Sequence, residues 1–167
     1  MTKETAVDQR LFRDVMGTFA TGVTVTTINV DDQPYGMTMN AVVSLSLDPP
    51  LVVVCVQQSS SMHERFLKAD AFCVNILSSD QKLISDLFAA HGDPEEPMGG
   101  FDYSNGKIGT PVLAGALAYA ECRVSERLPG GDHTIVIGEA IDVDFGSEDD
   151  LPLLFYRGKY RRLADGD

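Results

Sequence analysis

The sequence predicts a mainly β protein in which an antiparallel barrel, closed or partly open, carries peripheral helices. Two observations lead to this fold class: strand-like segments outnumber helical ones, and short turns join neighbouring strands as in hairpins. The chain has 167 residues, and no linker, charge block or internal repeat divides it. We therefore expect one domain over residues 1–167, with flexible ends at residues 1–9 and 164–167.

The first expected element is an amphipathic helix over residues 8–20, which ends at Thr21-Gly22. Residues 23–29 predict a strand, and a turn over residues 31–34 leads to the next strand. The apolar face of the helix consists of Leu11, Phe12, Val15, Met16 and Phe19.

Residues 37–47 alternate imperfectly between small polar and apolar side chains, which predicts a half-buried strand with one face free to meet a ligand. Pro49 and Pro50 then end the pairing, because proline has no amide donor. Residues 51–56 form a nearly continuous apolar run, which predicts a strand buried on both faces. In the first of these strands, Ser44 and Ser46 lie on one face, and Val43, Leu45 and Leu47 lie on the other.

Ser59, Ser60 and Ser61 precede a helical pattern over residues 62–69. Ser61 and Glu64 have the spacing of a capping box, in which the serine oxygen accepts a hydrogen bond from an otherwise unpaired amide. The alternative is that free amides at the helix start, beside several hydroxyls, bind a phosphate. These residues alone leave both interpretations open.

A strand over residues 71–77 and a helix over residues 80–90 follow, and Ser79 is expected to cap this helix. Residues 91–110 are rich in Gly, Pro, Asp and Asn, and so long a connection in a compact domain is more often a functional loop than a spacer. The inward positions of the helix are expected to be Leu83, Ile84, Leu87 and Phe88.

Two long strands are expected over residues 116–127 and 134–145. The residues between them, Pro-Gly-Gly-Asp at 129–132, are typical of a hairpin turn. A last strand over residues 153–156 leads to a basic tail.

The formal net charge of −12 argues against a nucleic acid or an anionic membrane as a partner, because both would repel the protein. The N-terminus lacks the apolar core of a signal peptide, so a cytoplasmic protein is expected. Cys55, Cys73 and Cys122 lack the paired spacing of a zinc or redox site, so no metal is expected. Buried, inert thiols are the expected state of Cys73 and Cys122.

Five segments stand in a fixed order along nearly the whole chain: TFATGVTVTT (18–27), GMTMNAVVSLSLDPPLVVVCV (36–56), SSSMHE (59–64), GDHTIVIGE (131–139) and LFYRGKYRRL (154–163). Together they resemble the flavin reductase-like family, the small NAD(P)H:flavin oxidoreductases that supply reduced flavin to two-component monooxygenases. The resemblance implies an FMN-binding split β-barrel that forms a homodimer, with the flavin near the subunit interface.

The resemblance also implies which residues bind the flavin. Met37, Thr38, Asn40 and Ala41 would border the isoalloxazine; Ser46, Cys55, Val56 and Gln57 would hold the ring edge and the ribityl chain; Ser59, Ser60 and Ser61 would receive the phosphate. The family often has a basic residue and a threonine where this chain has Ser61 and Met62, so the choice between FMN and FAD stays open. Hydrogen bonding at a strand end is the alternative role of Thr38 and Asn40, and core packing that of Cys55.

His133 is the expected residue on the nicotinamide side, because it follows a Gly-Gly-Asp turn and its family counterpart lies close to the flavin and the nicotinamide. A hydride needs no general base, so His133 would orient the rings and act electrostatically; a solvated turn histidine is the alternative. Arg157 would capture an anion, Tyr160 would lie with it at the cofactor, and Phe101 would cover a ring face or pin its own loop. His63 lies in the opening turn of a helix and is expected to be exposed, and His91 begins the loose loop and has no evident partner.

These implications lead to one function. NADH or NADPH would reduce bound FMN or FAD by ring stacking, from nicotinamide C4 to flavin N5, and the reduced flavin would serve a partner monooxygenase. The glycines do not form a dinucleotide-binding fingerprint, so NADH and NADPH are not distinguished. The alternative is a non-enzymatic flavin-binding or electron-carrier protein on the same barrel.

Overall fold

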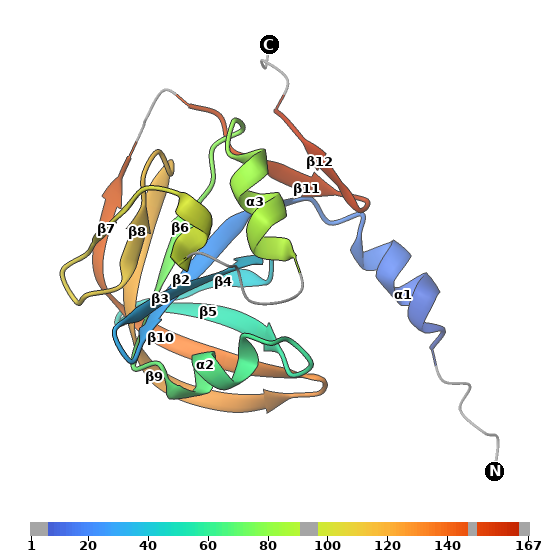
Figure 1. Cartoon of the computed structure of the whole chain (residues 1–167). Helices are drawn as coiled ribbons and strands as arrows, with labels where there is room; N and C mark the ends of the chain where they lie inside the picture. The colour runs from blue at the N-terminus through green and yellow to red at the C-terminus, as the bar shows by residue number, and fades with distance from the viewer. Residues whose placement is uncertain (1–6, 91–96, 147–149, 164–167) are drawn as a thin grey trace.

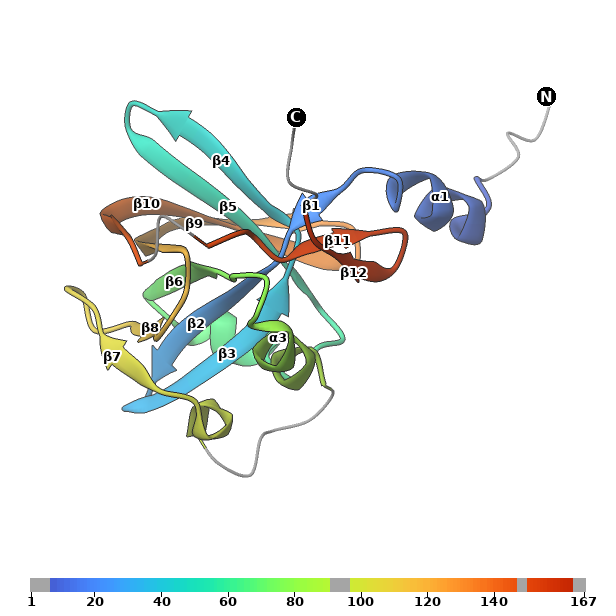
Figure 2. The same cartoon turned by 90° about the horizontal axis from the view of Figure 1, so that it is seen from above.

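A computed structural model describes residues 7–90, 97–146 and 150–163. Its main feature is a seven-stranded antiparallel sheet (Figure 1). Two small antiparallel sheets and a few short helices surround it (Figure 2). In sheet order, the seven strands are β3 (Gln33–Met39), β2 (Thr24–Val30), β6 (Ala71–Ile76), β9 (Ala118–Gly130), β10 (His133–Phe145), β5 (Pro50–Gln57) and β4 (Val42–Leu47).

The smaller elements lie around this sheet. One small sheet has β11 between β1 and β12, and the other pairs β7 with β8. The bounds are β1 (Thr21–Gly22), β7 (Tyr103–Asn105), β8 (Pro111–Leu113), β11 (Leu154–Tyr156), β12 (Lys159–Arg161), α1 (Gln9–Met16), α2 (His63–Lys68), α3 (Lys82–Ala89) and the 3-10 helix η1 (Pro97–Gly100).

The mainly β, antiparallel class is confirmed, but the sheet does not close into a barrel. Among the described residues, no ladder joins its two edge strands, β3 and β4. These two strands are nevertheless consecutive in the chain, with only Asn40 and Ala41 between them. Because two residues span little distance, the sheet must curl until its edges approach each other.

The single strand expected over residues 37–47 is wrong. Pairing with β2 ends at Met39, and pairing with β5 begins at Val42, because the chain crosses between opposite edges of the sheet at Asn40 and Ala41. The expected half-burial is also wrong for most of β4, because β4 and the start of β5 form a hairpin arm outside the body (Figure 2). Val43, Leu45 and Leu47 are exposed (Leu47 89%), and only Val42 among the apolar residues of β4 is partly buried. Along β5, only Val54 and Val56 are fully buried.

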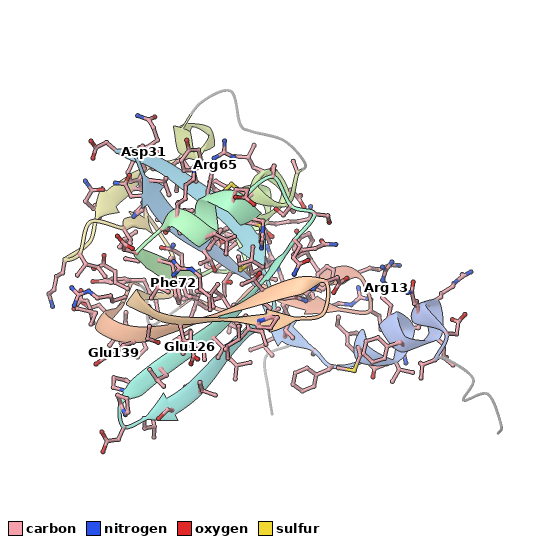
Figure 3. The ribbon with its side chains drawn as sticks, turned by 90° about the horizontal axis from the view of Figure 1, so that it is seen from below. Arg13, Asp31, Arg65, Phe72, Glu126 and Glu139 are labelled. Atoms are coloured by element: carbon pink, nitrogen blue, oxygen red, sulfur yellow. The ribbon has the colours of Figure 1, made fainter. Side chains whose placement is uncertain are left out.

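Helix α1 is confirmed but is shorter than expected. Asp8 caps it by accepting a hydrogen bond from the Leu11 amide at 2.7 Å, and Gly17 ends it. Gln9, which was expected to be flexible, is its first residue; residues 1–6 and 164–167 lie outside the described part of the chain. The helix stands clear of the sheet (Figure 3). Its apolar side chains and Phe19 beyond it are exposed: Leu11, Phe12, Val15, Met16 and Phe19.

The expected caps of α2 and α3 are wrong. Helix α2 begins after Met62 without a side-chain cap, and it is Ser60, not Ser61, whose hydroxyl accepts a hydrogen bond from the Met62 amide. Helix α3 begins after Gln81, because the Gln81 side chain accepts from the Ser78 amide and closes the turn that precedes it. Ile84 and Phe88 face inward as expected, but Leu83 and Leu87, which were expected to do the same, are exposed.

The hairpin between the two long strands is confirmed. Strand β9 runs to Gly130 and β10 starts at His133, so Gly131 and Asp132 form the turn. The last expected strand is β11, and the basic tail contains a further strand, β12, which the sequence analysis missed. Arg157 and Gly158 both have positive φ and make the tight turn between β11 and β12. In the loop expected over residues 91–110, residues 91–96 lie outside the described part.

Two apolar cores lie on opposite faces of β2. Ile28 faces the first core, which α2 covers, whereas Val23 and Val25 face the second core, which α3 covers. Phe72 is fully buried in the first core, and Figure 3 shows it on the side of the β9 and β10 hairpin opposite to Glu126 and Glu139.

A methyl group at Gly138 is expected to destabilise the first core. The new carbon would lie 2.6 Å from the Phe72 ring and 2.8 Å from Cβ of Cys122, and neither neighbour has free space. Overpacking of this kind costs about 1–3 kcal/mol, so the free energy of unfolding of Gly138→Ala in urea should be lower than that of the parent by this amount. Gly22→Ala is the matched control, since nothing lies within 4 Å of its new methyl. Equal midpoints for both variants would contradict the packing argument.

A buried carboxyl group fixes the loop before β8. Glu121 has no exposed surface, and it accepts hydrogen bonds from the amides of Lys107 (2.5 Å), Ile108 (3.3 Å) and Thr110 (3.3 Å) and from the Thr110 hydroxyl (2.6 Å). Gly106 leaves room for this carboxyl, because a Cβ there would lie 2.2 Å from it. The loop is therefore built around one side chain of β9.

Candidate functional site

Most of the predicted site residues meet at the end of β5. Gln57 lies opposite His133 in the ladder between β5 and β10, and the three serines follow after Gln58. The Ser60 hydroxyl contacts the Met37 sulfur at 3.3 Å, and the Cys55 amide donates to the Ala41 carbonyl at 3.1 Å. We call these residues and their neighbours in the sequence the β5-end patch: Met37, Asn40, Ala41, Cys55, Val56, Gln57, Ser59, Ser60, Ser61 and His133. The Val56 side chain is buried in the first core, so only its backbone is available here.

His133 is oriented by its neighbour in the turn. Its Nδ1 lies 2.7 Å from Oδ1 of Asp132, and the hydrogen bond and charge of His133 lower the pKa of the Asp132 carboxyl. An ionised carboxylate can only accept, so Nδ1 carries the proton. Within the described residues, Nε2 has no hydrogen-bond partner, and the half-exposed ring can present this nitrogen to a ligand.

The patch has polar groups that a flavin needs. The side chains of Asn40, Ser59 and Ser61 are exposed, and no hydrogen-bond partner is found for them among the described residues. An amide of this kind can pair with the polar edge of a ring, and hydroxyls can donate to a phosphate. The residues present therefore fit a flavin. The Ser60 hydroxyl already accepts a hydrogen bond from the Met62 amide at the helix start, which leaves the Ser59 and Ser61 hydroxyls for a ligand.

Arg65 is a residue of this region that the sequence analysis missed. Its guanidinium donates to the Ser61 carbonyl at 3.2 Å and lies over the Tyr35 ring, 4.4 Å from its centroid. It therefore brings positive charge to the serine segment, where the family often has a basic residue. The signal in the sequence is the spacing of four residues, which places Arg65 one helical turn after Ser61.

Three predicted residues lie elsewhere, around α3. The Thr38 hydroxyl donates to the Ser85 carbonyl at 2.7 Å, and Ser85 Oγ lies 2.9 Å from the Tyr160 hydroxyl. Burial raises the pKa of Tyr160, so the hydroxyl stays protonated at neutral pH. Phe101 and Tyr160 both pack against the second core. Thr38 thus points to the face of β3 opposite to Met37, and strand-end hydrogen bonding is what its side chain does here.

Ser46 and Arg157 also lie apart from the patch within one chain. Ser46 pairs with Leu51, at the opposite end of β5 from Gln57, and the strand length puts about 20 Å between the two ends. The Arg157 amide donates to the Gly17 carbonyl at 2.8 Å, and its guanidinium lies 5.4 Å from the Tyr156 ring centroid. Neither contact involves a residue of the β5-end patch.

Comparison with known proteins identifies the family. The sequence matches the family model of the flavin reductase like domain over residues 16–164, which is most of the chain. The protein belongs to the flavin reductase-like family.

The relatives of this flavin reductase-like protein are similar over nearly their whole length. It is 39% identical over 157 residues to FMN reductase (NADH) SmoA of Agrobacterium fabrum, covering 94% of this chain and 87% of that protein. It is 38% identical over 155 residues to HsaB, the reductase subunit of a flavin-dependent monooxygenase of Mycobacterium tuberculosis, covering 92% of this chain and 82% of HsaB.

Solved structures show the same fold. The flavin reductase PheA2 superposes with a TM-score of 0.86 at 43% identity, covering 95% of this chain and 100% of PheA2. The NADH:FAD oxidoreductase SgcE6 of Streptomyces globisporus superposes with a TM-score of 0.89 at 37% identity, covering 99% and 100% of the two chains.

The thiols of this flavin reductase-like protein are all unpaired. Burial raises the pKa of Cys122 to about 12 and that of Cys73 further, so the expectation of buried thiols at these two positions is confirmed. Cys55 is half-buried, and burial also raises its pKa. Within the described ranges, no group of three or more His, Cys, Asp or Glu side chains is arranged for a metal ion, and no helix is long and apolar enough to cross a membrane.

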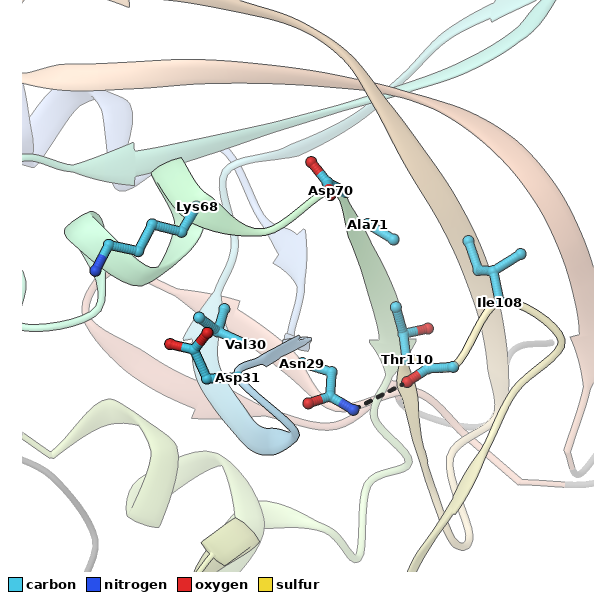
Figure 4. Close-up of a pocket in the computed structure, with 9 residues that line it drawn as sticks. Asn29, Val30, Asp31, Lys68, Asp70, Ala71, Ile108 and Thr110 are labelled. Atoms are coloured by element: carbon cyan, nitrogen blue, oxygen red, sulfur yellow. Dashed lines mark hydrogen bonds between the residues drawn. The ribbon is translucent and has the colours of Figure 1, made fainter.

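A separate pocket of about 340 Å³ opens beside the turn after β2 (Figure 4). Asn29 bridges it by donating to the Gly109 carbonyl at 3.4 Å, and Asp31, Lys68 and Asp70 bring charges to its edge. None of the predicted site residues lines this pocket. The candidate site of the flavin reductase-like protein is the β5-end patch, because most of the predicted site residues lie there.

Proposed function

We propose that this protein is an NAD(P)H-dependent flavin reductase that reduces FMN or FAD and supplies the reduced flavin to a partner monooxygenase. The observation that carries the proposal is the match of the chain, over nearly its full length, to proteins named as NADH-dependent FMN and FAD reductases and as reductase subunits of monooxygenases. The names of these relatives do not favour the electron-carrier alternative.

The β5-end patch is the proposed flavin site. Ser59, Ser60 and Ser61 would hold the phosphate, and Arg65 would add positive charge beside them. Asn40 would pair with the ring edge. Met37, Ala41, Cys55, Val56 and Gln57, which also belong to the patch, are the remaining proposed ring and ribityl contacts. Five further proposed cofactor contacts lie apart from the patch in one chain, so they would reach the flavin from the second chain of a homodimer: Thr38, Ser46, Phe101, Arg157 and Tyr160.

When bound, the flavin supplies the hydride chemistry. The chain has to bind and orient two rings, because hydride transfer is fast only when they are held in near-attack contact, about 3–3.5 Å apart. His133 presents Nε2 at the margin of the patch while Asp132 fixes the ring from the other side. We assign to His133 the role of orienting the nicotinamide, with no proton transfer required.

A split barrel, a single domain over residues 1–167 and a cytoplasmic location belong to the same proposal. The curl that brings β3 and β4 within two residues of each other supports the split barrel. The three unpaired thiols are consistent with a reducing compartment.

We further propose a homodimer, because the apolar faces of α1 and β4 are exposed in one chain and exposed patches of this kind mark interfaces.

Phe12→Glu combined with Val15→Glu is expected to give a monomer with lower flavin affinity, since two charges per chain would enter an apolar contact. Sedimentation checks the mass. Arg10→Glu, on the same helix, is the control for charge alone. A dimeric double variant would place the interface elsewhere.

Steady-state oxidation of NADH and NADPH, each with FMN, FAD and riboflavin, tests the function. We expect flavin-dependent nicotinamide oxidation with at least one pair. A protein that binds flavin but oxidises neither nicotinamide above background would refute the reductase and support the carrier.

A further inference from the structure

The hairpin turn that carries His133 is held by a side chain from outside the hairpin. The backbone amide of Gln58 donates to the Asp132 carbonyl at 3.0 Å. The Gln58 side-chain nitrogen lies 3.4 Å from the Gly131 carbonyl and 3.3 Å from the His133 carbonyl, and it donates to both. One glutamine therefore bonds to three consecutive residues of the turn.

A second side chain holds the residue after His133. His63 Nε2 lies 2.8 Å from the Thr134 hydroxyl, and only 13% of the His63 side chain is exposed. His63 is the first residue of α2, and Phe66 of the same helix is buried in the first core, so the helix holds the His63 ring in place. This ring has its own partner, and the sequence analysis did not foresee it.

Gln58 and His63 flank the serines of the β5-end patch. Residues 58–63 and residues 131–134 are thus connected at both ends by side chains, although about seventy residues separate them in the sequence. A two-residue hairpin turn with Gly131 at φ 71° has few contacts of its own. The bonds from Gln58 and His63 determine where the His133 ring lies relative to the serines.

We propose that Gln58 and His63 are positioning residues that fix the His133 turn against the flavin-phosphate segment and thereby set the nicotinamide distance. The inference rests on the proposed function, because it assigns His133 to the nicotinamide. Each side chain acts through His133 and touches no reacting atom. Loss of either bond should raise KM for the nicotinamide and leave the flavin in place.

The first experiment compares Gln58→Met and His63→Phe with the parent. One lost hydrogen bond corresponds to about a 3-fold to 10-fold weakening, so KM for NADH should rise by that factor while the flavin Kd stays within about twofold. Gln33→Met, an exposed glutamine on β3, is the matched control and should change neither value. His63→Gln keeps a donor and should recover most of the loss. A parallel rise in flavin Kd would overturn the proposal.

A double-mutant cycle with His133→Ala separates positioning from stability. If Gln58 acts through His133, Gln58→Met should have no further effect on KM in the His133→Ala background. The same fold-increase in both backgrounds would show a structural role and overturn the proposal.

The bonds from Gln58 and His63 to residues 131–134 act together as a clamp on the turn. Hydrogen exchange at the backbone amides of residues 131–134 tests this clamp without enzyme turnover. Exchange should be faster in Gln58→Met and His63→Phe than in Gln33→Met, and unchanged exchange would overturn the clamp. A parent protein that is inert with both nicotinamides would refute the proposed function, while the exchange result would still decide whether the clamp exists.

Discussion

His133→Ala is expected to lower kcat/KM for NADH by about 10-fold to 100-fold and to leave the flavin Kd within about twofold. The reason is geometric. Without the imidazole, the nicotinamide loses a contact and is free to shift, and a misplacement of about 1 Å can lower the rate by that factor. The proposed flavin contacts come from other residues of the β5-end patch, so they should survive. Stopped-flow reduction of the bound flavin measures the step directly.

Two further variants sharpen this result. His133→Gln keeps a donor near the same place and should retain part of the rate. Asp132→Asn removes the carboxylate that fixes the Nδ1 proton, so it should lower the rate less than loss of the ring does. Thermal unfolding of each variant controls for stability. If His133→Ala reduces flavin at the parental rate, the assignment of the nicotinamide side is wrong.

Glu121→Ala is expected to give the largest loss of stability, at least about 4 kcal/mol in the free energy of unfolding. The substitution would leave the amides of Lys107, Ile108 and Thr110 and one hydroxyl without their acceptor in a buried place. Each unpaired buried donor costs about 1–3 kcal/mol, and the lost side chain adds a cavity.

Urea unfolding checks this loss against a matched variant. Glu126→Ala is on the same strand, but its side chain is exposed (Figure 3), so it should change the free energy of unfolding by less than about 0.5 kcal/mol. Glu121→Gln keeps the side-chain volume but places an amide among hydrogen-bond donors. Its loss in the free energy of unfolding should therefore lie between those of Glu121→Ala and Glu126→Ala. A Glu121→Ala loss below about 1 kcal/mol would mean that the loop finds other acceptors.

Local patterns predicted the elements well where the neighbours in sequence are also the neighbours in space. The β9 and β10 hairpin and strand β6 follow from alternation and turn residues, and α1 from its apolar spacing with Asp8 before it. The expected helix caps were wrong for another reason, because several nearby side chains compete to close the same turn. The Met62 amide donates to Ser60 and not to Ser61, and the Gln81 side chain, not Ser79, closes the turn before α3 by accepting from the Ser78 amide.

The candidate site divides in the same way. The order of the motifs was sufficient to give the family, and the patch at the end of β5 contains most of the residues that it implied. Arg65 was missed although its spacing of four residues from Ser61 is visible in the sequence, and Gln58 was missed because an amide side chain after a strand end carries no signal until its partner is known. Their partners are a carbonyl of the serine segment and a turn about seventy residues away.

By itself, the sequence determined that this is an acidic, mainly β member of the flavin reductase-like family with its serines next to a buried strand. Only the tertiary structure decided that the strand expected over residues 37–47 breaks at Asn40 to change edges, and that His133 is anchored from α2 and the end of β5. The physical reason is that alternation and turn chemistry act between adjacent residues. Strand pairing across a sheet and hydrogen bonds between distant segments depend on which surfaces the folded chain brings together.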